Sequence, residues 1–530
     1  MKVLFLTQGR TLKLFDDVAR SMSENDPDFH AGFYVTDSAN YRAHCSERPE
    51  FPGDAHVLSE WEVLAAASRR TADINRLRQY EREIGDPVLW NMVVADRRLF
   101  LGQNAVREQD YATRFGHDEL LSVTQTMLEN LEDFFDRLQP DMIVGFICVT
   151  AAEYAANLIA RSRGIPFLNL RPTRLRNYFY AGEDVQEPSA FLEALYREYG
   201  ENGIPTETQA EAERIVDEVR SEHAMYEGVL PPPAKFDPYA RKYTSTLRAN
   251  ALSRIRRVIA EEYYYRLGPG QYDPHHQDRF AARWFHRVRR PVRLRTINRE
   301  LRDCYATTEQ LADMEYAFYP LHKEPEVTML VYGRPFLNQI EVVRNIARSL
   351  PVGMKLVVKE HPGAIGYRSK DYYWKLLAIP NVVLAAPWLT SREVLEHTRL
   401  VTVIGGSIAL EAAIIGRPVL VLGRVPFAFL PDSMLKHAER PDDLAYEICD
   451  LMAGFRSDEE AIVRYVAAVV TSSVPIDFYS VLIGRSGVYR PDGGDTGQYN
   501  TQINRLAGYL TTSLQARREE PMHLSTISKT

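Results

Sequence analysis

The segment Val401-Thr402-Val403-Ile404-Gly405-Gly406-Ser407-Ile408-Ala409-Leu410-Glu411-Ala412 decides the fold class of this chain. Its β-branched apolar start predicts a buried strand, and the residues after the serine predict a helix, so a glycine turn joins strand to helix. Glycine lets a ligand approach the backbone closely, and the first turn of a helix offers free N–H groups and a positive dipole end. We therefore predict a phosphate-binding loop at Gly405, Gly406 and Ser407. Glu411, one turn further on, could bond ribose hydroxyls, and the alternative role of Ser407 is a plain helix cap.

A second strand leads into Leu356-Val357-Val358-Lys359-Glu360-His361-Pro362-Gly363. Open α/β sheets bind ligands at the carboxyl ends of their strands. Lys359 and His361 can both donate to a phosphate, and the Pro-Gly pair that follows fixes a tight turn. A lone His-Pro dipeptide is also typical of a simple turn. Together with the glycine loop, however, it predicts a nucleotide site that includes Lys359 and His361.

The sequence around these loops alternates between strands and helices. In the C-terminal half we expect strands at Thr328–Tyr332, Lys355–Val358, Val382–Ala385, Leu400–Ile404 and Val419–Leu422. We expect helices at Asn338–Ser349, Tyr372–Leu377, Ser391–His397 and Ile408–Ile415. In the N-terminal half we expect strands at Val3–Thr7, Ala31–Thr36, Met142–Cys148 and Phe167–Leu170, and helices at Leu12–Met22 and Ala151–Arg163. Near-continuous apolar strands separated by helices predict parallel sheets that are buried on both faces.

The length of 530 residues requires more than one core. We predict an α/β protein with two Rossmann-like domains facing a cleft and a helical insertion between them. The expected domains are an N-terminal Rossmann-like domain on the acceptor side (1–183), a helical insertion with a basic segment (184–305), a C-terminal Rossmann-like domain on the donor-nucleotide side (306–440), a helical segment (441–516) and a disordered tail (517–530).

The insertion contains one acidic and one basic segment. Glu207–His223 predicts an amphipathic helix, and arginines then gather between Arg279 and Arg299, with Trp284 and Phe285 among them. Such a segment is typical of the solvated face of a helical insertion. Basic residues mixed with aromatic ones also suit an anionic membrane surface or an acidic glycan, so both alternatives stay open.

Composition excludes several classes of protein. The formal net charge of −7 argues against general nucleic-acid binding. The four cysteines form no CxxC or Cys/His pair, which indicates a reducing cytoplasm and no zinc site. No apolar run approaches the roughly 18–20 residues of a membrane span, and Val3–Leu6 is too short for a signal peptide. We expect a cytoplasmic protein that is soluble or peripheral at the inner face of the membrane.

A third polar loop, Tyr319-Pro320-Leu321-His322-Lys323-Glu324-Pro325-Glu326, stands at the start of the second half. It combines a histidine with two carboxylates in a segment stiffened by proline. This loop could reach into the cleft, although an interdomain linker would look much the same.

These motifs resemble the bacterial capsule polysaccharide biosynthesis family. The resemblance rests on Tyr319–His322, Pro325–Glu326, Val358–Pro362, the Gly405-Gly-Ser loop with its following Leu-Glu-Ala, and Gly416-Arg-Pro-Val-Leu. It covers about Tyr319–Gly423. That family looks like glycosyltransferases of the GT-B architecture and includes the Kdo transferases of capsule linkers. His322 with Pro325 stands where those transferases show a Gln-Pro motif, which leaves the identity of the donor open.

The resemblance implies an enzyme that needs no cofactor and no metal ion. In similar sialyltransferases, a His-Pro dipeptide and a serine-bearing loop hold the CMP of the donor, so His361 and Ser407 would contact the donor phosphate or cytidine. His322 is a candidate catalytic residue, as is Glu153, a carboxylate that could deprotonate the acceptor hydroxyl. The alternative for Glu153 is a surface helix carboxylate. Arg171 and Arg174 follow an expected strand and could bind an anionic acceptor or form surface ion pairs.

The function implied is transfer of a sugar from a nucleotide-activated donor, CMP-linked by analogy, to a glycan or glycolipid acceptor. Three other functions stay open. One is a CDP-polyol phosphotransferase of the teichoic-acid type, and another is a nucleotide-sugar 2-epimerase. The last is a non-catalytic capsule-assembly protein that keeps the fold, for which an intact phosphate site would have no use.

Overall fold

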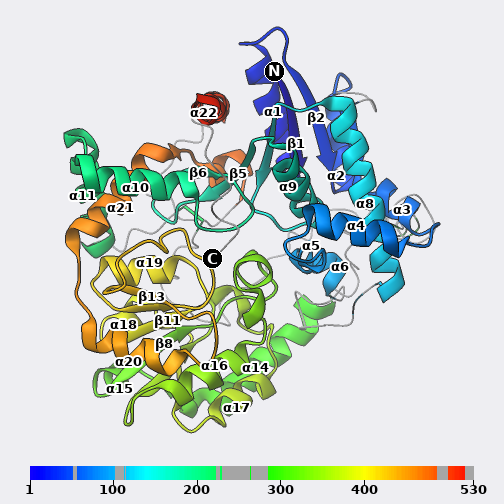
Figure 1. The fold of residues 1–530 in the computed structure, drawn as a ribbon. Helices are drawn as coiled ribbons and strands as arrows, with labels where there is room; N and C mark the ends of the chain where they lie inside the picture. Colours follow the sequence, from blue (N-terminus) through cyan, green and yellow to red (C-terminus); the bar gives the residue numbers. More distant parts are fainter. Residues whose placement is uncertain are drawn as a thin grey trace, which may run out of the picture.

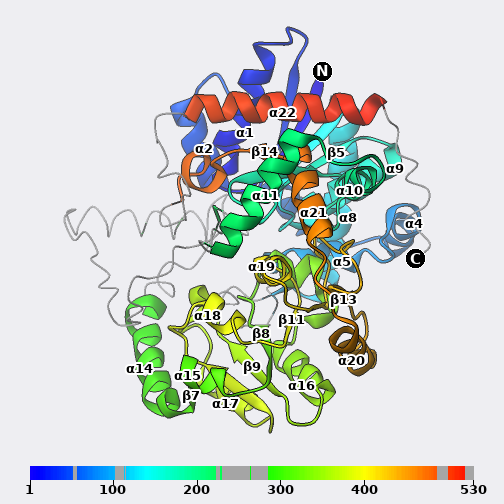
Figure 2. The ribbon, with the colours of Figure 1, turned by 90° about the vertical axis from the view of Figure 1, so that its left-hand side faces the viewer.

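A computed structural model of the chain describes residues 1–51, 56–101, 113, 115–221, 227–228, 259, 263, 272, 284–485 and 499–519. These residues form two α/β halves, which lie one above the other in both ribbon views (Figures 1 and 2). Each half is built on its own seven-stranded sheet, and most neighbouring strands run parallel. The predicted fold class is therefore confirmed.

The first sheet has the strand order β14-β6-β5-β4-β1-β2-β3. Its strands are β1 (Lys2–Thr7), β2 (His30–Val35), β3 (Val57–Ser59), β4 (Met142–Phe146), β5 (Phe167–Pro172), β6 (Tyr178–Gly182) and β14 (Val474–Pro475). The strands from β5 to β3 pair in parallel, and β6 and β14 extend the sheet in antiparallel fashion. β1 is buried from Val3 onward, which explains its unbroken apolar sequence.

Helices connect the parallel strands of this sheet. They are α1 (Thr11–Ser23), α2 (Ser38–Glu47), α3 (Glu60–Ala67), α4 (Ile74–Ile84), α5 (Trp90–Ala95), α6 (Arg97–Phe100), α8 (His117–Leu138) and α9 (Ala151–Arg163). α9 begins where the Thr150 hydroxyl accepts a hydrogen bond from Glu153 N at 3.1 Å, and it ends at Gly164 with φ of 65°. Its first ten residues are all buried, because α9 packs against β5 and against α4, α5 and α8.

The second sheet is entirely parallel and has the order β13-β12-β11-β8-β9-β10-β7. Its strands are β7 (Tyr305–Ala306), β8 (Tyr316–Pro320), β9 (Lys355–Lys359), β10 (Val382–Ala385), β11 (Leu400–Val403), β12 (Val419–Val421) and β13 (Leu435–His437). Helices and helical turns connect them: α15 (Thr308–Ala312), η5 (Thr328–Tyr332), η6 (Arg334–Phe336), α16 (Gln339–Ser349), η7 (Pro362–Ala364), α17 (Lys370–Leu377), α18 (Ser391–Leu395) and α19 (Ser407–Ile414).

One predicted strand is wrong. Thr328–Tyr332 forms the π-helical turn η5, and the central strand of the second sheet is Tyr316–Pro320. No strand was predicted there, and its last two residues were expected to begin the polar loop Tyr319–Glu326. All five residues of η5 are buried. A short, fully buried apolar run has the same composition in a strand as in a helical turn, so its sequence does not distinguish the two. The other predicted strands and helices named above agree in type, and their ends agree within two residues.

The middle of the chain is helical where the structure describes it. It contains α10 (Ala190–Asn202), α11 (Thr206–Ser221), the π-helical turn η3 (Phe285–Arg289), α14 (Arg290–Leu301) and the short turn η4 (Arg302–Cys304). α11 is the predicted acidic helix. α10 and α11 pack against α21 (Glu459–Ser472), whereas α14 packs against α17. Arg279 and Arg283 of the predicted basic segment lie outside the described residues.

The C-terminal part of the chain returns to the first half. α20 (Leu444–Gly454) packs against α16, but β14 joins the first sheet and α22 (Tyr499–Glu519) packs along α1, as Figure 2 shows. The π-helical turn η8 (Phe478–Leu482) lies between them. Residues 441–516 are thus shared between the halves. The exact boundaries of the five predicted domains stay a prediction, and residues 520–530 of the predicted tail lie outside the described part of the chain.

Each sheet has one point where the chain changes direction across it. In the first sheet, the chain runs outward from β1 to β2 and β3, then resumes at β4 on the other side of β1. In the second sheet, it runs from β8 to β9 and β10, then resumes at β11 on the other side of β8. Parallel sheets bind ligands between the loops that leave such a pair of strands. The two switch points, β1/β4 and β8/β11, are therefore the places where the fold would bind a ligand.

Candidate active site

The loop that leaves β8 at the second switch point carries His322. The side-chain amide of Gln339 holds the His322 peptide: Oε1 accepts from His322 N at 2.7 Å, and Nε2 donates to the His322 carbonyl at 3.0 Å. Burial, with smaller contributions from His361 and Arg368, lowers the pKa of His322 to about 3, so its ring is neutral at pH 7. The ring Nε2 is buried and has no hydrogen-bond partner among the described residues. His322 therefore keeps one buried ring nitrogen whose hydrogen bond no described residue supplies.

Arg368 ties this loop to the one that leaves β9. Its guanidinium forms ion pairs with Glu360 and, at 3.4 Å, with Glu324, and it donates to the His322 carbonyl at 2.5 Å. Tyr373 Oη donates to the other oxygen of Glu360 at 2.7 Å. Because Arg368 is buried and faces two carboxylates, its charge fixes the two loops and is not free for a ligand.

His361 begins the turn after β9. Its Nδ1 accepts from Gly363 N at 3.0 Å, so the proton of the neutral ring must be on Nε2. The side chain is exposed, yet the surrounding protein lowers the pKa of His361 below its ordinary value. His361 also lies within electrostatic reach of His322, so the fold brings these two predicted residues together.

The third loop leaves β11 as Gly405-Gly406-Ser407. Gly406 has φ of 110° and ψ of −179°, a conformation that side chains other than glycine rarely allow. A Cβ on Gly406 would stand 3.9 Å from Cε1 of His322, so the loop passes directly beside that ring. Gly406 is the N-cap residue of α19 and provides no side-chain cap for its first amides. The positive end of α19 therefore opens next to His322.

Ser407 is the first residue of α19 and not its cap, so the alternative of a plain cap is wrong. Its side chain is half-buried, and its hydroxyl makes no hydrogen bond with any residue that the structure describes. The serine is free to bond a ligand at the helix start.

The two other predicted donor-site residues, Lys359 and Glu411, are buried. Lys359 Nζ donates to the Glu360 carbonyl at 3.5 Å, and burial lowers its pKa to about 8. Burial raises the pKa of Glu411 to about 7, and its Oε1 lies 3.8 Å from Nη1 of Arg392 in α18. Lys359 keeps unused donors at the end of β9, whereas Glu411 faces α18. The predicted contact of Glu411 with ribose stays a prediction.

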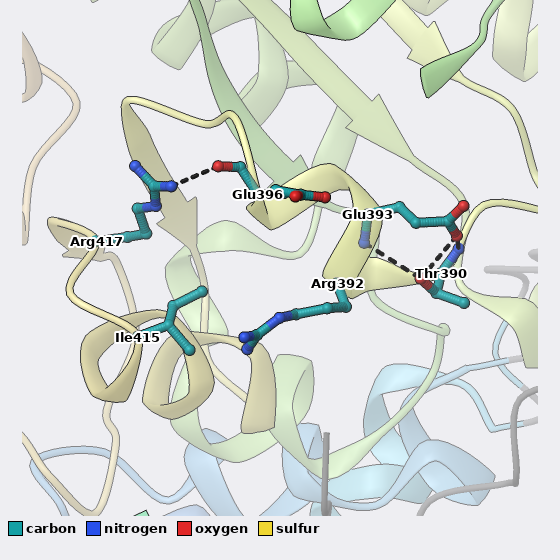
Figure 3. Close-up of a pocket in the computed structure, with 6 residues that line it drawn as sticks. All are labelled: Thr390, Arg392, Glu393, Glu396, Ile415 and Arg417. Carbon is teal, nitrogen blue, oxygen red and sulfur yellow. Dashed lines mark hydrogen bonds between the residues drawn. The ribbon is translucent and has the colours of Figure 1, made fainter. Parts of the chain in front are cut away.

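A pocket lies in the second half between α18 and the C-terminal end of α19 (Figure 3). It is lined by Thr390, Arg392, Glu393, Glu396, Ile415 and Arg417. Its polar groups form hydrogen bonds with one another: Thr390 Oγ1 donates to Glu393 at 2.8 Å, and Arg417 donates to the Glu396 carbonyl. None of the six belongs to a switch-point loop. We therefore do not assign this pocket to the donor.

Glu153 occupies the first switch point, between β1 and β4. Gln8, which follows β1, donates through Nε2 to Glu153 Oε2 at 2.5 Å, and Val149 N, in the loop after β4, donates to the same oxygen at 3.0 Å. The Thr150 hydroxyl donates to it at 3.1 Å. Glu153 is 1% exposed, so the alternative of a surface carboxylate is wrong. Burial raises its pKa to about 8.

The other carboxyl oxygen, Glu153 Oε1, has no hydrogen-bond partner among the described residues. Nor has the buried Nδ2 of Asn169. Both atoms face Gly145: a Cβ there would stand 3.7 Å from Glu153 Oε1 and 3.5 Å from Asn169 Nδ2. A carboxyl group with one anchored oxygen, one free oxygen and a pKa near the physiological range is equipped to take a proton from a bound hydroxyl.

Arg171, predicted to bind an acceptor, is buried inside the first half. Its guanidinium forms an ion pair with Glu187 at 3.0 Å and donates to Asn169 Oδ1 at 3.0 Å and to the Gln186 carbonyl at 2.6 Å. The structure does not support the predicted role. The physical reason is that β5 extends to Pro172, so Arg171 lies within a strand and pairs with Tyr180 of β6.

Arg174 lies in the turn that follows β5, with φ of 73°, and is half-buried. It is within electrostatic reach of Tyr332 in the second half. Arg174 thus stands on the side of the first half that meets the second, and its acceptor-binding role stays a prediction.

Polar contacts join the two halves close to both switch points. Arg334 in the second half donates to Tyr154 Oη at 2.9 Å, and Tyr154 is the residue after Glu153. Arg97 in the first half donates to the Pro325 carbonyl at 3.3 Å, three residues beyond His322. The loops that carry the proposed acid and the histidines therefore lie on the sides of the halves that face each other.

Three residues that shape the site were not predicted: Gln8, Gln339 and Arg368. Each makes a hydrogen bond with a residue that is distant in the sequence. Gln8 lies 145 positions from Glu153, and Gln339 and Arg368 lie 17 and 46 positions from His322. Only Gln8 carried a usable signal, because it directly follows the first strand at its carboxyl end.

The described residues contain no group of three or more His, Cys, Asp or Glu side chains that could hold a metal ion. No helix within these parts of the chain is long and apolar enough to cross a membrane.

Comparison with protein families matches residues 240–432 to the family described as capsule polysaccharide biosynthesis protein. The range includes the His322, His361 and Gly405–Ser407 loops, which confirms the resemblance expected from the sequence and supports a role in capsular polysaccharide biosynthesis. No curated protein matches the chain.

Several solved structures are similar to this chain. One is the beta Kdo 2,4 transferase of KpsC from Thermosulfurimonas dismutans, with 13% sequence identity over 70% of this chain and 88% of that chain and a TM-score of 0.35. Another is the beta Kdo 2,7 transferase of the same protein, with 10% identity over 73% of this chain and 89% of that chain and a TM-score of 0.35. A third is UDP-GlcNAc 2-epimerase from Neisseria meningitidis bound to UDP-GlcNAc, with 12% identity over 97% of this chain and 100% of that chain and a TM-score of 0.22. Because these TM-scores are below 0.5, we base the function on the site and the family match.

Proposed function

We propose that this chain is a glycosyltransferase of bacterial capsular polysaccharide biosynthesis, which transfers a sugar from a nucleotide-activated donor to a glycan or glycolipid acceptor. One observation carries the proposal: the two switch points present complementary chemistry. The second offers neutral histidines and the start of α19, and the first offers Glu153 with one free carboxyl oxygen. The family match of residues 240–432 adds the link to capsule synthesis.

On the donor side, the phosphate lies against the first turn of α19, beside His322 and His361. Breaking the bond between sugar and phosphate leaves negative charge on the phosphate. The Nε2–H of His361, the Ser407 hydroxyl and the amides of α19 are held in place to stabilise that charge. Fixed donors of this kind need no metal ion, and a CMP-linked donor is the one that the family resemblance favours.

On the acceptor side, Glu153 acts as the general base. Because its pKa is raised to about 8, only the ionised minority of Glu153 at pH 7 reacts. The acceptor hydroxyl gives its proton to Oε1 of this carboxylate while its oxygen forms a bond to the sugar carbon and the bond from that carbon to the phosphate breaks. Gln8, Val149 and Thr150 hold the other carboxyl oxygen, so the base is fixed when the acceptor arrives.

The test is an assay of nucleotide release by the purified full chain. CMP-sugar, UDP-sugar and CDP-polyol donors are each offered with and without a capsular glycan acceptor, in the presence and absence of EDTA. We expect nucleotide release that requires both a nucleotide sugar and the acceptor and that survives EDTA. CMP release from a CDP-polyol would indicate the phosphotransferase, UDP-sugar turnover without acceptor would indicate the epimerase, and no reaction at all would favour the non-catalytic assembly protein.

We further propose that the protein lies at the cytoplasmic face of the membrane, and the outer surface of η3 and α14 supports this. The inner surface of this helical segment is occupied: Arg290 donates to the Ile365 carbonyl at 3.0 Å, and Arg293 donates to the Tyr367 carbonyl at 2.6 Å. Phe285 is buried beneath it. These contacts fix which side chains remain outside.

The outer surface combines apolar and basic side chains. Trp284, Val288 and Val292 recur every four residues and are 51%, 47% and 54% exposed. Arg287, Arg295 and Arg299 are exposed on the same segment. Apolar side chains among arginines suit the interface of an anionic bilayer, which would bring a lipid-linked acceptor to the enzyme.

Vesicle flotation tests this placement. The wild type is expected to float with phosphatidylglycerol vesicles at low salt and not with phosphatidylcholine vesicles, and Arg287→Glu with Arg295→Glu should release it. Arg82→Glu, on the exposed face of α4, is the matched control. A wild-type protein that floats with neither kind of vesicle would contradict the proposed binding to an anionic membrane surface.

A further inference from the structure

Arg97 stands where the first half touches the loop of His322. It is the first residue of α6, and its Nη1 donates to the Pro325 carbonyl at 3.3 Å across the contact between the halves. Its side chain is exposed, yet crowding by protein, followed by the nearby charge of Arg98, lowers its pKa from the ordinary value. Like His361, Arg97 is both open to solvent and surrounded by protein.

No carboxylate among the described residues forms an ion pair with Arg97. The acids nearest in sequence are already engaged: Asp96 pairs with Arg98 at 2.5 Å, and Arg98 pairs with Glu60 at 2.8 Å. Asp96 also accepts from Ala151 N, at the start of α9, at 3.2 Å. This buried set holds the backbone of Arg97 beside the helix that carries Glu153. Its charges pair with one another, so among the described residues Asp96 and Glu326 act on the Arg97 guanidinium only through space.

The guanidinium also lies close to the donor side. Pro325, whose carbonyl accepts from Arg97, is followed by Glu326, and the charge of Glu326 acts on both Arg97 and His361. One bond to a carbonyl uses one of the five N–H donors of an arginine. The remaining planar set of donors matches two oxygens of a phosphate or carboxylate.

We infer that Arg97 binds an oxyanion of the substrate, and that the first half thereby supplies a residue to the donor site of the second half. The ligand is either a phosphate of the nucleotide donor or a carboxylate of a sugar. This inference rests on the proposed function, and it identifies a contact that forms only when both halves surround the substrate. His361 and Arg97 would then hold the reacting group from its two sides.

The experiment compares wild type, Arg97→Gln and Arg97→Lys, with Arg82→Gln as a matched surface control. Calorimetry with pyrophosphate and with CMP reports on phosphate binding, and steady-state kinetics report on the acceptor. If Arg97 contacts the phosphate, Arg97→Gln weakens pyrophosphate and CMP binding by about 10- to 100-fold. If it contacts a sugar carboxylate, these affinities stay constant and the KM of the sugar substrate rises by about the same factor. Arg97→Lys should recover part of either loss, since it keeps the charge and loses the planar donors.

Equal binding and equal kinetics in Arg97→Gln and Arg82→Gln would overturn the inference. So would a wild type that binds neither pyrophosphate nor any substrate. The proposed function fails separately, if the wild type binds pyrophosphate through Arg97 but releases no nucleotide from any donor. Unchanged melting temperatures in all variants exclude a fold defect as the cause.

Discussion

The two switch points of this protein occupy equivalent positions in two similar sheets, yet their chemistry differs. At β1/β4, an acid is buried, and three hydrogen bonds hold one of its oxygens while the other is left free. At β8/β11, two neutral histidines meet the uncapped start of a helix. Parallel strands create the crevice in each case, and the residues that follow them determine its use.

The difference shows how burial alone can produce opposite outcomes. Desolvation raises the pKa of Glu153 to about 8 and lowers that of His322 to about 3, because it disfavours the charged form of either group. The first switch point is thereby prepared to hold a proton and the second to donate hydrogen bonds without carrying charge. Proton transfer and stabilisation of the phosphate are assigned to different halves of one chain.

The largest expected effect comes from removing the acid. Glu153→Gln keeps the shape of the side chain and removes its capacity to accept a proton, so turnover should fall by about 10²- to 10⁴-fold. CMP affinity should stay constant, since we propose that the donor binds in the other half. Nucleotide-release kinetics with Glu62→Gln, an exposed residue of α3, as the control would measure this. A full-rate Glu153→Gln variant would leave the first switch point without a catalytic role.

Arg171 tests whether the first half binds an acceptor at this arginine. Arg171→Met leaves Glu187 buried without its cation and should cost about 3–5 kcal/mol in the free energy of unfolding. Urea denaturation measures the loss, and Arg171→Met combined with Glu187→Leu should recover much of it. Unchanged stability together with a raised acceptor KM would instead restore the acceptor-binding role.

His361 tests the second switch point. The ring is exposed and its Nδ1 accepts one backbone hydrogen bond, so His361→Ala should lower turnover at least tenfold with little change in melting temperature. His437→Ala, on β13 and away from both switch points, serves as the control. A large fall in the melting temperature would show that His361 is structural.

The smallest effect concerns stability and pH. The folded-state pKa of Glu153, about 8, lies above the ordinary value of 4.5. The unfolded chain therefore loses its proton first, and the contribution of Glu153 to stability becomes less favourable as the pH rises from about 4.5 to about 8. Glu153→Gln removes this dependence, so the melting temperature of the variant minus that of the wild type should increase from pH 5 to pH 8. A constant difference across that range would mean that the acid is not buried in its neutral form.

Much of the fold could be predicted from the sequence, because local signals dominate it. α9 was predicted at its observed bounds from the helical pattern of Ala151–Arg163, and in the structure Thr150 caps its start and Gly164 ends it. The strand–glycine–helix pattern at Val401–Ala412 likewise located β11 and α19. Where local signals fail, the prediction failed: the five apolar residues of η5 suit a strand as well as a buried turn.

The site was only partly predictable, because its properties depend on contacts between distant segments. Glu153 and His361 follow from their positions after strands, but the burial of Glu153 results from packing of α9 on both sides and from Gln8, 145 residues away. Arg171 was misassigned because β5 runs two residues further than its apolar pattern, through pairing with β6. Pairing of this kind leaves no mark in the sequence of one strand.

In the proposed mechanism, the second switch point binds the donor nucleotide and the first supplies the base. Calorimetric titration of CMP into the wild type, Glu153→Gln and His361→Ala tests this division directly. We predict that the wild type and Glu153→Gln bind with equal affinity and that His361→Ala binds at least tenfold more weakly. Loss of binding in Glu153→Gln with full binding in His361→Ala would contradict the assignment of the donor to the second half, and a wild type that binds no nucleotide would contradict the account as a whole.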